Sequence, residues 1–240
     1  MFPRKEKITI IAELSPQNEG DMSLLETMIM QAKVAGADMI KLQLYDSVKL
    51  LGDTRKKFAE ITNQELIRIV RYADLIKIPI FASVFDEERL SWVNNIESIN
   101  TNKIASKVHL KDDRLCRQIL DNGDVTFISN GLDQNNFKYA SYGNAKYLYC
   151  VANYPTYLDD ICLPNFNSHK TYVGISDHSY GLTVVKAAVV RGAKYIEKHF
   201  TLSKGMQSSI NKAHYGSMVF EELRELRTFC DDFVRIILDD

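Results

Sequence analysis

Short runs of β-branched and apolar residues recur along the chain, and segments with helical periodicity fill most of the intervals between them. The apolar runs predict eight strands, at residues 8–13, 38–43, 78–83, 101–106, 125–130, 146–151, 171–176 and 193–200. The intervals predict helices at residues 23–36, 63–76, 86–94, 112–121, 133–142, 181–190 and 219–236. The interval 154–170 is an exception, because Pro155 and Pro164 interrupt any helical pattern, and we expect a loop or a short helix there.

The alternation of strands and helices is typical of a parallel sheet, because each crossover must return the chain to the same end of the sheet. Eight such units in 240 residues predict an α/β fold, a (β/α)8 TIM barrel that forms a single domain over residues 1–240. The rival fold is an open doubly wound sheet, which usually has fewer strands and a glycine-rich first turn. The segment after the first predicted strand reads LSPQNEG, which lacks that turn.

The composition excludes several classes of protein. The chain is 45% hydrophobic and 25% charged, with a net charge of −1, so nothing in it favours binding to nucleic acid. No apolar run approaches the roughly 18 residues that a membrane span requires, and the charged segment MFPRKEK is unlike a secretory signal. The four cysteines lack CxxC spacing, and we expect free thiols in a reducing cytoplasm: Cys116, Cys150, Cys162 and Cys230.

Polar side chains gather where the predicted strands end. In a barrel of this kind the C-terminal ends of all the strands surround one site. The residues at these ends are cations, hydroxyls, amides, carboxylates and imidazoles: Glu13, Lys41, Gln43, Ser83, Lys103, Ser106, Ser129, Asn130, Tyr149, Ser176, Asp177, His178, Glu197, Lys198 and His199. The opposite ends carry no comparable set, so the sequence predicts a polar site at the C-terminal face.

Two lysines within predicted strands, Lys41 and Lys103, are flanked by apolar residues. A buried lysine needs an anion, because an unpaired charge is costly to remove from water. One interpretation is a salt bridge to Glu13 or Glu197; the other is a phosphate or carboxylate of a ligand, which the strand-end serines would also bind. Glu13 itself is either a partner of a lysine or a general acid or base with a raised pKa.

Two histidines, His178 and His199, end the seventh and eighth predicted strands, which are neighbours in a closed barrel. Imidazoles on adjacent strand ends can bind one divalent metal ion and leave positions open for water and substrate. Asp177 or Glu197 could orient an imidazole by accepting a hydrogen bond from the ring nitrogen that does not bind the metal. The alternative is that both histidines are hydrogen-bonded structural residues.

In this order the segments resemble the sialic acid synthase family, the bacterial N-acetylneuraminate synthases and their relatives. The matching stretches are IAEL…EG (11–20), AGADMIKLQLY (35–45), FASVFD (81–86), NKIAS (102–106), ISNG (128–131), YCVANYPTYLDD (149–160), GISDHSYG (174–181) and GAKYIEKHFTL (192–202). The resemblance spans nearly the whole chain. It implies a (β/α)8 barrel that condenses phosphoenolpyruvate with an acylamino sugar, releases phosphate and forms a nine-carbon 2-keto acid.

The resemblance also implies roles for individual residues. The positions that would bind phosphoenolpyruvate are Lys41, Ser83, Lys103, Ser106, Ser129, Tyr154 and Ser176. The metal ligands would be His178 and His199, holding Mn²⁺ or Mg²⁺. The catalytic set would be Glu13, Gln43, His178 and His199. The implied substrates are phosphoenolpyruvate and a sugar aldehyde, with no nucleic acid and no membrane as partner.

Several positions depart from the family pattern. In KIASKV, Val108 stands where the family has a glutamate that contacts the sugar and the reacting centre, and Lys107 replaces a glycine. Asn18 replaces a histidine, Ala152 replaces a polar residue, and Ile210 stands where an aspartate contacts the sugar. The small antifreeze-like domain that follows the barrel in typical members is not expected within these 240 residues.

These departures leave most of the phosphoenolpyruvate half and the metal ligands in place, whereas much of the sugar half is changed. We therefore expect a working synthase for a surface polysaccharide, with an acceptor other than N-acetylmannosamine, as a homodimer or with a partner chain that completes the site. Lys107 and His109 are expected to contact an acceptor that bears a phosphate or carboxylate. Two alternatives remain: a catalytically silent barrel that binds phosphoenolpyruvate as a sensor or subunit partner, and a metal-dependent aldolase or isomerase that uses Lys41 or Lys103.

Overall fold

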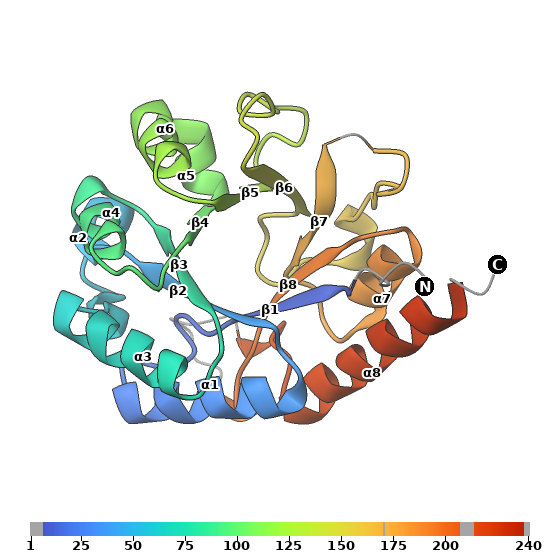
Figure 1. The fold of residues 1–240 in the computed structure, drawn as a ribbon, viewed down its shortest axis with the longest axis horizontal. Coiled ribbons are helices and arrows are strands. Elements are labelled where there is room, and N and C mark those ends of the chain that lie inside the picture. The colour runs from blue at the N-terminus through green and yellow to red at the C-terminus, as the bar shows by residue number, and fades with distance from the viewer. Residues whose placement is uncertain (1–6, 170, 207–213, 238–240) are drawn as a thin grey trace.

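Eight parallel strands close into a barrel in the computed structural model, which describes residues 7–169, 171–206 and 214–237 (Figure 1). Each strand pairs with the next along the chain, and the last pairs with the first. The strands are β1 (Thr9–Glu13), β2 (Met39–Leu44), β3 (Ile80–Val84), β4 (Thr101–Ile104), β5 (Val125–Asn130), β6 (Ala145–Cys150), β7 (Tyr172–Asp177) and β8 (Tyr195–His199). The predicted (β/α)8 barrel is confirmed.

Helices surround the barrel, and α1, α3 and α8 cover one side of it (Figure 1). The α-helices are α1 (Met22–Ala35), α2 (Ser47–Leu51), α3 (Asn63–Leu75), α4 (Glu87–Asn94), α5 (Ser106–Lys111), α6 (Asp113–Asp121), α7 (Thr183–Val190) and α8 (Phe220–Ile237). The short 3-10 helices are η1 (Lys57–Ala59), η2 (Leu158–Asp160) and η3 (Lys204–Met206). In the described part of the chain, no helix has both the length and the apolar character to cross a membrane.

The helix predicted at residues 133–142 is wrong, because the chain forms turns there. The side-chain oxygen of Asn136 accepts a hydrogen bond from the backbone N–H of Lys138 at 3.2 Å, which favours a turn over a helix. The backbone N–H of Tyr139 donates to the hydroxyl of Tyr147 at 2.9 Å, and the Tyr139 hydroxyl donates to Asp113 at 2.7 Å. These tertiary hydrogen bonds override the local helical pattern.

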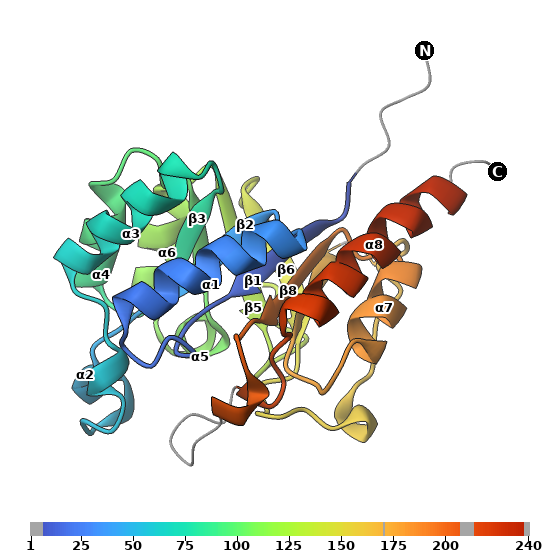
Figure 2. The same ribbon diagram turned by 90° about the horizontal axis from the view of Figure 1, so that it is seen from below.

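Two short helices, α2 and α5, directly follow strand ends and lie toward one end of the barrel (Figure 2). In α2 the Asp46 side chain accepts from the backbone N–H of Lys49 at 2.9 Å, and Gly52 ends the helix with a φ of 79°. The caps are ordinary helix signals. The helices themselves have only five and six residues, too few for periodicity to predict them.

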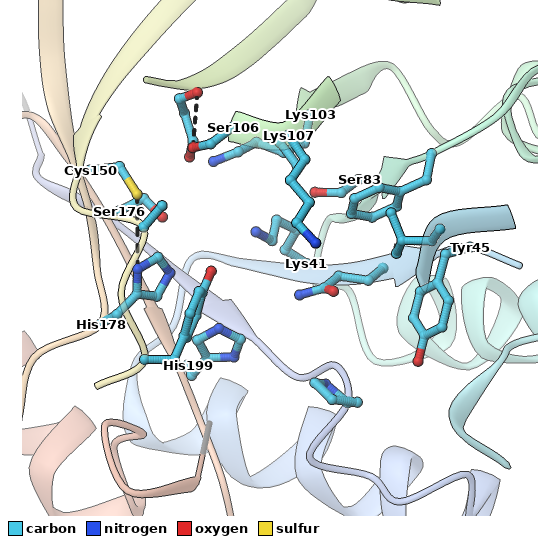
Figure 3. Close-up of a pocket in the computed structure, with 18 of the residues that line it drawn as sticks. Lys41, Tyr45, Ser83, Lys103, Ser106, Lys107, Cys150, Ser176, His178 and His199 are labelled. Atoms are coloured by element: carbon cyan, nitrogen blue, oxygen red, sulfur yellow. Dashed lines mark hydrogen bonds between the residues drawn. The ribbon is translucent and has the colours of Figure 1, made fainter. Parts of the chain in front are cut away.

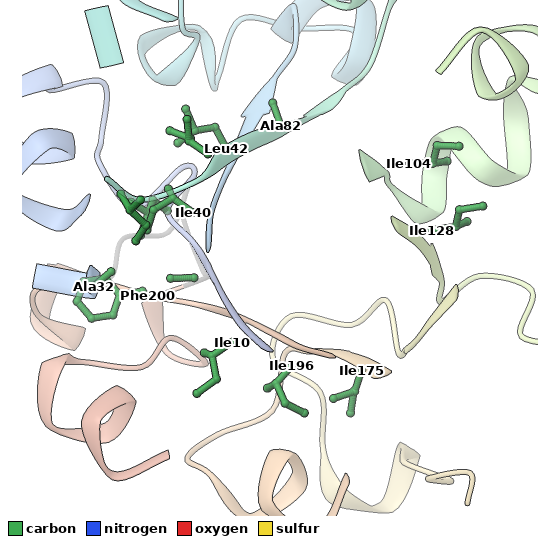
Figure 4. Packing of buried hydrophobic residues seen from close by; sticks show 14 of the residues in the cluster. Ile10, Ala32, Ile40, Leu42, Ala82, Ile104, Ile128, Ile175, Ile196 and Phe200 are labelled. Carbon is green, nitrogen blue, oxygen red and sulfur yellow. The ribbon is translucent and has the colours of Figure 1, made fainter. Parts of the chain in front are cut away.

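The strands are apolar on both faces, because the barrel buries each face in a different layer. Outward-facing residues, among them Ile10, Ile40 and Ile196, pack against the helices (Figure 4). Inward-facing residues fill the floor of the barrel: Ile11, Phe81, Phe127 and Leu148. This double burial explains why the strands appear in the sequence as nearly continuous apolar runs.

Immediately above this floor, the inward positions become polar. Two residues after Ile11, Phe81, Phe127 and Tyr195, the chain places Glu13, Ser83, Ser129 and Glu197. The strand register sets Glu13 beside Lys41 and His199, and Ser176 beside Glu197. The apolar floor therefore supports a polar layer at the C-terminal end of the barrel.

We predict that Phe127→Ala lowers the free energy of unfolding by about 3–5 kcal/mol, measured by urea denaturation, because it opens a cavity in the floor. The Phe127 ring lies 5.8 Å from Phe81 and 5.0 Å from Tyr195, measured between ring centroids, and Phe127 is 1% exposed. Phe58→Ala is the matched control, since Phe58 is 45% exposed. It should change stability by no more than about 0.5 kcal/mol. Equal losses in the two variants would contradict this account of the floor.

Candidate active site

A cavity of about 530 Å³ opens at the C-terminal ends of the strands (Figure 3). Ten of the eleven site residues named from the sequence line it: Lys41, Gln43, Ser83, Lys103, Ser106, Ser129, Tyr154, Ser176, His178 and His199. The eleventh, Glu13, is not among the lining residues and is buried against Lys41. The fold therefore brings together side chains from most of the strand ends that the sequence marked as polar.

Two lysines and two glutamates form a buried ion network at the wall of this cavity. The Nζ of Lys41 lies 2.8 Å from Oε1 of Glu197 and 2.7 Å from Oε2 of Glu13. The Nζ of Lys103 lies 2.8 Å from Oε2 of Glu197. The Ser176 hydroxyl donates to Oε1 of Glu197 at 2.7 Å. The ion pairs expected as one interpretation are present, and they hold both lysines at the cavity wall.

The network fixes the charges of its members. Burial alone would raise the pKa of Glu197, but the charges and hydrogen bonds of Lys103 and Lys41 outweigh it and hold that pKa well below its usual value. Burial would lower the pKa of Lys41, but Glu13 and Glu197 raise it. Burial lowers the pKa of Lys103 to about 8, with Glu197 opposing and Lys41 reinforcing the change. Burial also raises the pKa of Glu13, against the pull of Lys41. At neutral pH Glu197 is therefore an anion between two cations.

The hydroxyl of Ser106 is fixed by the backbone of the next strand end. Its oxygen accepts from the backbone N–H of Gly131 at 3.0 Å, and it donates to the carbonyl of Ser129 at 3.3 Å. A Cβ atom on Gly131 would lie 3.1 Å from this hydroxyl and 2.9 Å from the sulfur of Cys150. Any larger residue would press on the side chains of Cys150 and Ser106, so glycine suits this close approach.

Cys150 lines the cavity, although the sequence did not mark it as a site residue. It occupies the inward position two residues after Leu148 of the floor, so strand alternation could have identified it. Burial raises the pKa of its thiol to about 11. The thiol is therefore protonated at neutral pH and packs at the wall instead of acting as a nucleophile.

His178 and His199 lie side by side, with ring centroids 5.6 Å apart (Figure 3). The Nδ1–H of His178 donates to the carbonyl of Val151 at 3.0 Å, which leaves Nε2 as the free ring nitrogen. The Nδ1 of His199 lies 3.2 Å from Oε1 and 2.9 Å from Nε2 of the buried Gln17 amide. When the amide oxygen accepts from Nδ1, Nε2 of His199 is free as well. Sequence reasoning missed Gln17, because nothing in a loop sequence shows which side chain reaches an imidazole.

The histidine pair fits a catalytic metal site better than a structural one. Burial lowers the pKa of His178 to about 4 and the pKa of His199 well below its usual value, so both rings are neutral, as metal ligands must be. Among the described residues, no group of three or more His, Cys, Asp and Glu side chains could enclose a metal ion. Two neutral imidazoles would leave the other coordination positions to water and substrate, as in open catalytic sites.

Helix α5 directs neighbouring residues of the segment KIASKVH to different surroundings, some to the cavity and some to the apolar core. Val108 is 6% exposed and packs in the outer apolar layer, whereas the exposed Lys107 lines the cavity. The His109 ring packs against the rings of Tyr139 and Tyr147, at centroid distances of 5.7 and 5.9 Å. The expectation that His109 contacts the acceptor is therefore wrong, because its turn of the helix faces the core. Of Lys107, Val108 and His109, Lys107 is the one that lines the cavity.

Further departures from the family pattern lie around the site. Ala152 lines the cavity and supplies no polar group. Asn18 is fully buried, and neither polar atom of its side chain has a hydrogen-bond partner among the described residues. Ile210 lies outside the described residues. Two cations that the sequence did not single out, Arg55 and Lys56, also line the cavity from the segment between α2 and η1.

Comparison with known proteins identifies the family. The sequence model of the NeuB family matches residues 28–237. Pseudaminic acid synthase from Campylobacter jejuni is 31% identical over 256 residues, covering 94% of this chain and 73% of that protein. Human N-acetylneuraminate-9-phosphate synthase is 26% identical over 247 residues, covering 90% of this chain and 67% of that protein.

A solved structure agrees with these sequence relatives. The N-acetylneuraminic acid synthetase from Leptospira borgpetersenii, in complex with citrate, superimposes with a TM-score of 0.85 and is 27% identical. The match covers 97% of this chain and 86% of that one. The resemblance read from the motifs is confirmed, and the chain belongs to the NeuB family of sialic acid and pseudaminic acid synthase-like proteins.

Proposed function

We propose that this protein is a phosphoenolpyruvate-dependent synthase that condenses phosphoenolpyruvate with a sugar aldehyde and releases phosphate. The product is a 2-keto-3-deoxy sugar acid of the sialic acid type. One observation carries the proposal: the seven residues expected to bind phosphoenolpyruvate and the two expected metal ligands line a single cavity. The named products of the relatives, pseudaminic acid and N-acetylneuraminate 9-phosphate, support the class of product.

The ion network is suited to hold phosphoenolpyruvate, which carries a carboxylate and a phosphate. Lys41 and Lys103 present cations at the wall, and the cavity-lining serines supply hydroxyl donors beside them. Hydrogen bonds from charged donors are stronger than neutral ones, and they gain further strength in a buried site. Because ion pairs already position the lysines, little reorganisation is needed when the substrate binds.

The reaction then follows from positioning. C3 of phosphoenolpyruvate forms a bond to the aldehyde carbon, and C2 becomes electron-poor. Water adds at C2, and the resulting tetrahedral carbon expels phosphate, while the former aldehyde oxygen gains a proton. The lysines and serines hold the phosphate and carboxylate throughout these steps, so the protein contributes orientation and electrostatic stabilisation.

The remaining residues act on the acceptor side in this proposal. His178 and His199 would hold Mn²⁺ or Mg²⁺, which supplies Lewis-acid polarisation of the aldehyde when it is bound. In this proposal Val151 and Gln17 accept hydrogen bonds from the Nδ1 atoms of these rings, which leaves both Nε2 atoms for the metal. The Gln43 amide, which donates to Glu13 at 3.4 Å and to the carbonyl of Ser15 at 3.3 Å, is placed to contact the acceptor. Glu13 acts by holding Lys41.

The wider setting completes the proposal. The acceptor differs from N-acetylmannosamine, because Val108 stands where the family has a glutamate that contacts the sugar. The product serves a surface polysaccharide, and a homodimer or a partner chain contributes to the sugar side. The four free thiols favour a cytoplasmic location.

A second candidate function is a catalytically silent barrel that binds phosphoenolpyruvate as a sensor or subunit partner. The burial of Val108 in the outer apolar layer favours it, since α5 places no carboxylate in the cavity. The aldolase interpretation is supported only by the lowered pKa of Lys103. Lys41 is less suited to forming a Schiff base, because its raised pKa keeps the amine protonated.

We predict that phosphate release from phosphoenolpyruvate requires both a sugar aldehyde and Mn²⁺ or Mg²⁺, measured over a panel of aldoses. The His178→Ala/His199→Ala double variant should lose this release by about a thousandfold, because it removes both metal ligands. In calorimetry without metal, the double variant should bind phosphoenolpyruvate within about threefold of the parent, because Lys41 and Lys103 remain.

The control for this experiment is Lys57→Ala, an exposed lysine of η1 that does not line the cavity, and it should match the parent. Binding of phosphoenolpyruvate without phosphate release for any aldehyde would support the silent barrel. Absence of both binding and release would overturn the proposed function.

We predict that phosphoenolpyruvate binds more weakly as the pH rises through about 8, because Lys103 loses its proton there. A lysine with a lowered pKa is charged below that pKa and neutral above it, while Lys41 keeps its charge because its pKa is raised. Calorimetry should show the dissociation constant rising by up to about tenfold per pH unit above pH 8. In Lys103→Arg the cation cannot titrate in this range, so the rise should disappear. The same rise in the arginine variant would assign it to another group.

A further inference from the structure

The cavity contains a second group of cations besides Lys41 and Lys103. Arg55, Lys56 and Lys107, here called the basic trio, line it from two separate segments. Arg55 and Lys56 lie between α2 and η1, and Lys107 lies in α5. Figure 3 shows the Lys107 side chain extending into the cavity from the segment that carries Lys103 and Ser106.

The basic trio lacks the carboxylates that hold the deeper lysines. Arg55 pairs with Asp53, with Nη2 and Oδ2 2.8 Å apart. In the part of the chain that the structure describes, the side-chain nitrogens of Lys56 and Lys107 form no ion pair. Burial lowers the pKa of Lys56, the charges of Arg55 and Lys107 lower it further, and Glu19 only partly opposes them. Lys56 is thus close enough to Arg55 and Lys107 for their charges to repel its own, and an anion bound beside it would relieve that repulsion.

This anion is distinct from the groups of phosphoenolpyruvate. Lys41 and Lys103 are buried within the strands, at 5% and 1% exposure, whereas Lys107 and Arg55 are exposed. Apolar and aromatic side chains share the cavity with the basic trio: Tyr45, Leu50, Leu51, Phe85 and Leu132. The basic trio therefore belongs to the more open, partly apolar part of the cavity, where a second substrate would enter.

The charge of the basic trio indicates which anion it would bind. Asp53 offsets Arg55, and Glu19 opposes part of the charge of Lys56, which leaves an excess of more than one positive charge. A phosphate monoester carries close to two negative charges at neutral pH and offers several strong acceptor oxygens. A carboxylate carries a single negative charge and would leave part of the excess uncompensated.

We propose that the basic trio binds a phosphate monoester on the acceptor, so that the second substrate is the phosphate ester of a sugar aldehyde. This inference rests on the proposed function, because it assigns the acceptor for the same cavity. It also gives the exposed Lys107, which stands in place of a glycine of the family pattern, a direct role in choosing the acceptor.

The test uses calorimetry on the full chain saturated with phosphoenolpyruvate, so that it does not depend on turnover. The probes are inorganic phosphate and pairs of alditols with and without a terminal phosphate: N-acetylmannosaminitol, arabinitol and erythritol. Alditols lack the aldehyde and cannot react. We expect at least one phosphorylated alditol to bind about tenfold or more tightly than its unphosphorylated partner, and more tightly than inorganic phosphate.

The variant is Lys56→Gln/Lys107→Gln, which removes two charges from side chains that are not fully buried and should leave the melting temperature unchanged. It should weaken binding of the phosphorylated alditol by about tenfold or more and change the affinity for phosphoenolpyruvate by less than about twofold. Lys57→Gln is the matched control, because it removes a charge from an adjacent exposed lysine outside the cavity lining. It should alter neither affinity.

Each outcome separates this inference from the function on which it rests. Equal binding of phosphorylated and unphosphorylated alditols, with phosphoenolpyruvate bound normally, overturns the phosphate subsite and leaves the synthase proposal standing. Tighter binding of inorganic phosphate than of any alditol phosphate also overturns it, because the site would then take a free ion. If the double variant weakens binding of phosphoenolpyruvate as much as binding of the alditol phosphate, the basic trio belongs to the phosphoenolpyruvate site. Failure of phosphoenolpyruvate to bind overturns both proposals.

Discussion

The carboxylate of Glu197, held between Lys41 and Lys103, is the interaction on which the rest of the site depends. All three side chains are almost fully buried, so each charge requires the others. Removal of one partner from a buried ion pair typically costs about 3–5 kcal/mol, because the remaining charge is left in a medium of low dielectric constant. The barrel register makes this arrangement possible, since β8 sets Glu197 at the same level as Ser176 of β7. The network thus fixes cations at the cavity wall before any substrate arrives.

The cavity combines two electrostatic regimes. In the deep part, carboxylates hold the lysines in fixed positions, as is required for orienting a reacting anion. In the more open part, Lys56 and Lys107 form no ion pair with a carboxylate of the described residues. A preorganised deep region suits the chemistry common to a family, and an adaptable outer region suits the choice of acceptor. In the proposed function these two tasks fall on different residues of one cavity.

Sequence reasoning located the strands and most of the site because both follow from local rules. Strand alternation put Lys41, Ser83 and Glu197 on the inward face, and barrel topology brought the strand ends together. It failed where tertiary contacts decide the outcome. The turns at residues 133–142 depend on the hydrogen bond from Tyr139 to Tyr147, and a short helix turns Val108 and His109 into the core. No local pattern shows which way a five- or six-residue helix faces.

The buried ion network also helps to decide whether its charges serve the stability of the barrel or the binding of a ligand. Replacing a buried ion pair by well-packed apolar residues is often neutral or stabilising, so Lys41, Lys103, Glu13 and Glu197 are a poor means of stabilising a barrel. The apolar floor beneath them already supplies packing. A buried ion network beside a cavity is better explained by an anionic ligand that requires its lysines. Both the synthase and the silent barrel bind such a ligand. They differ in the role of the neighbouring histidine pair, which only the synthase would use to hold a metal ion. Neutral, hydrogen-bonded imidazoles beside an anion site are what metal-assisted condensation needs, and anion binding alone gives them no role.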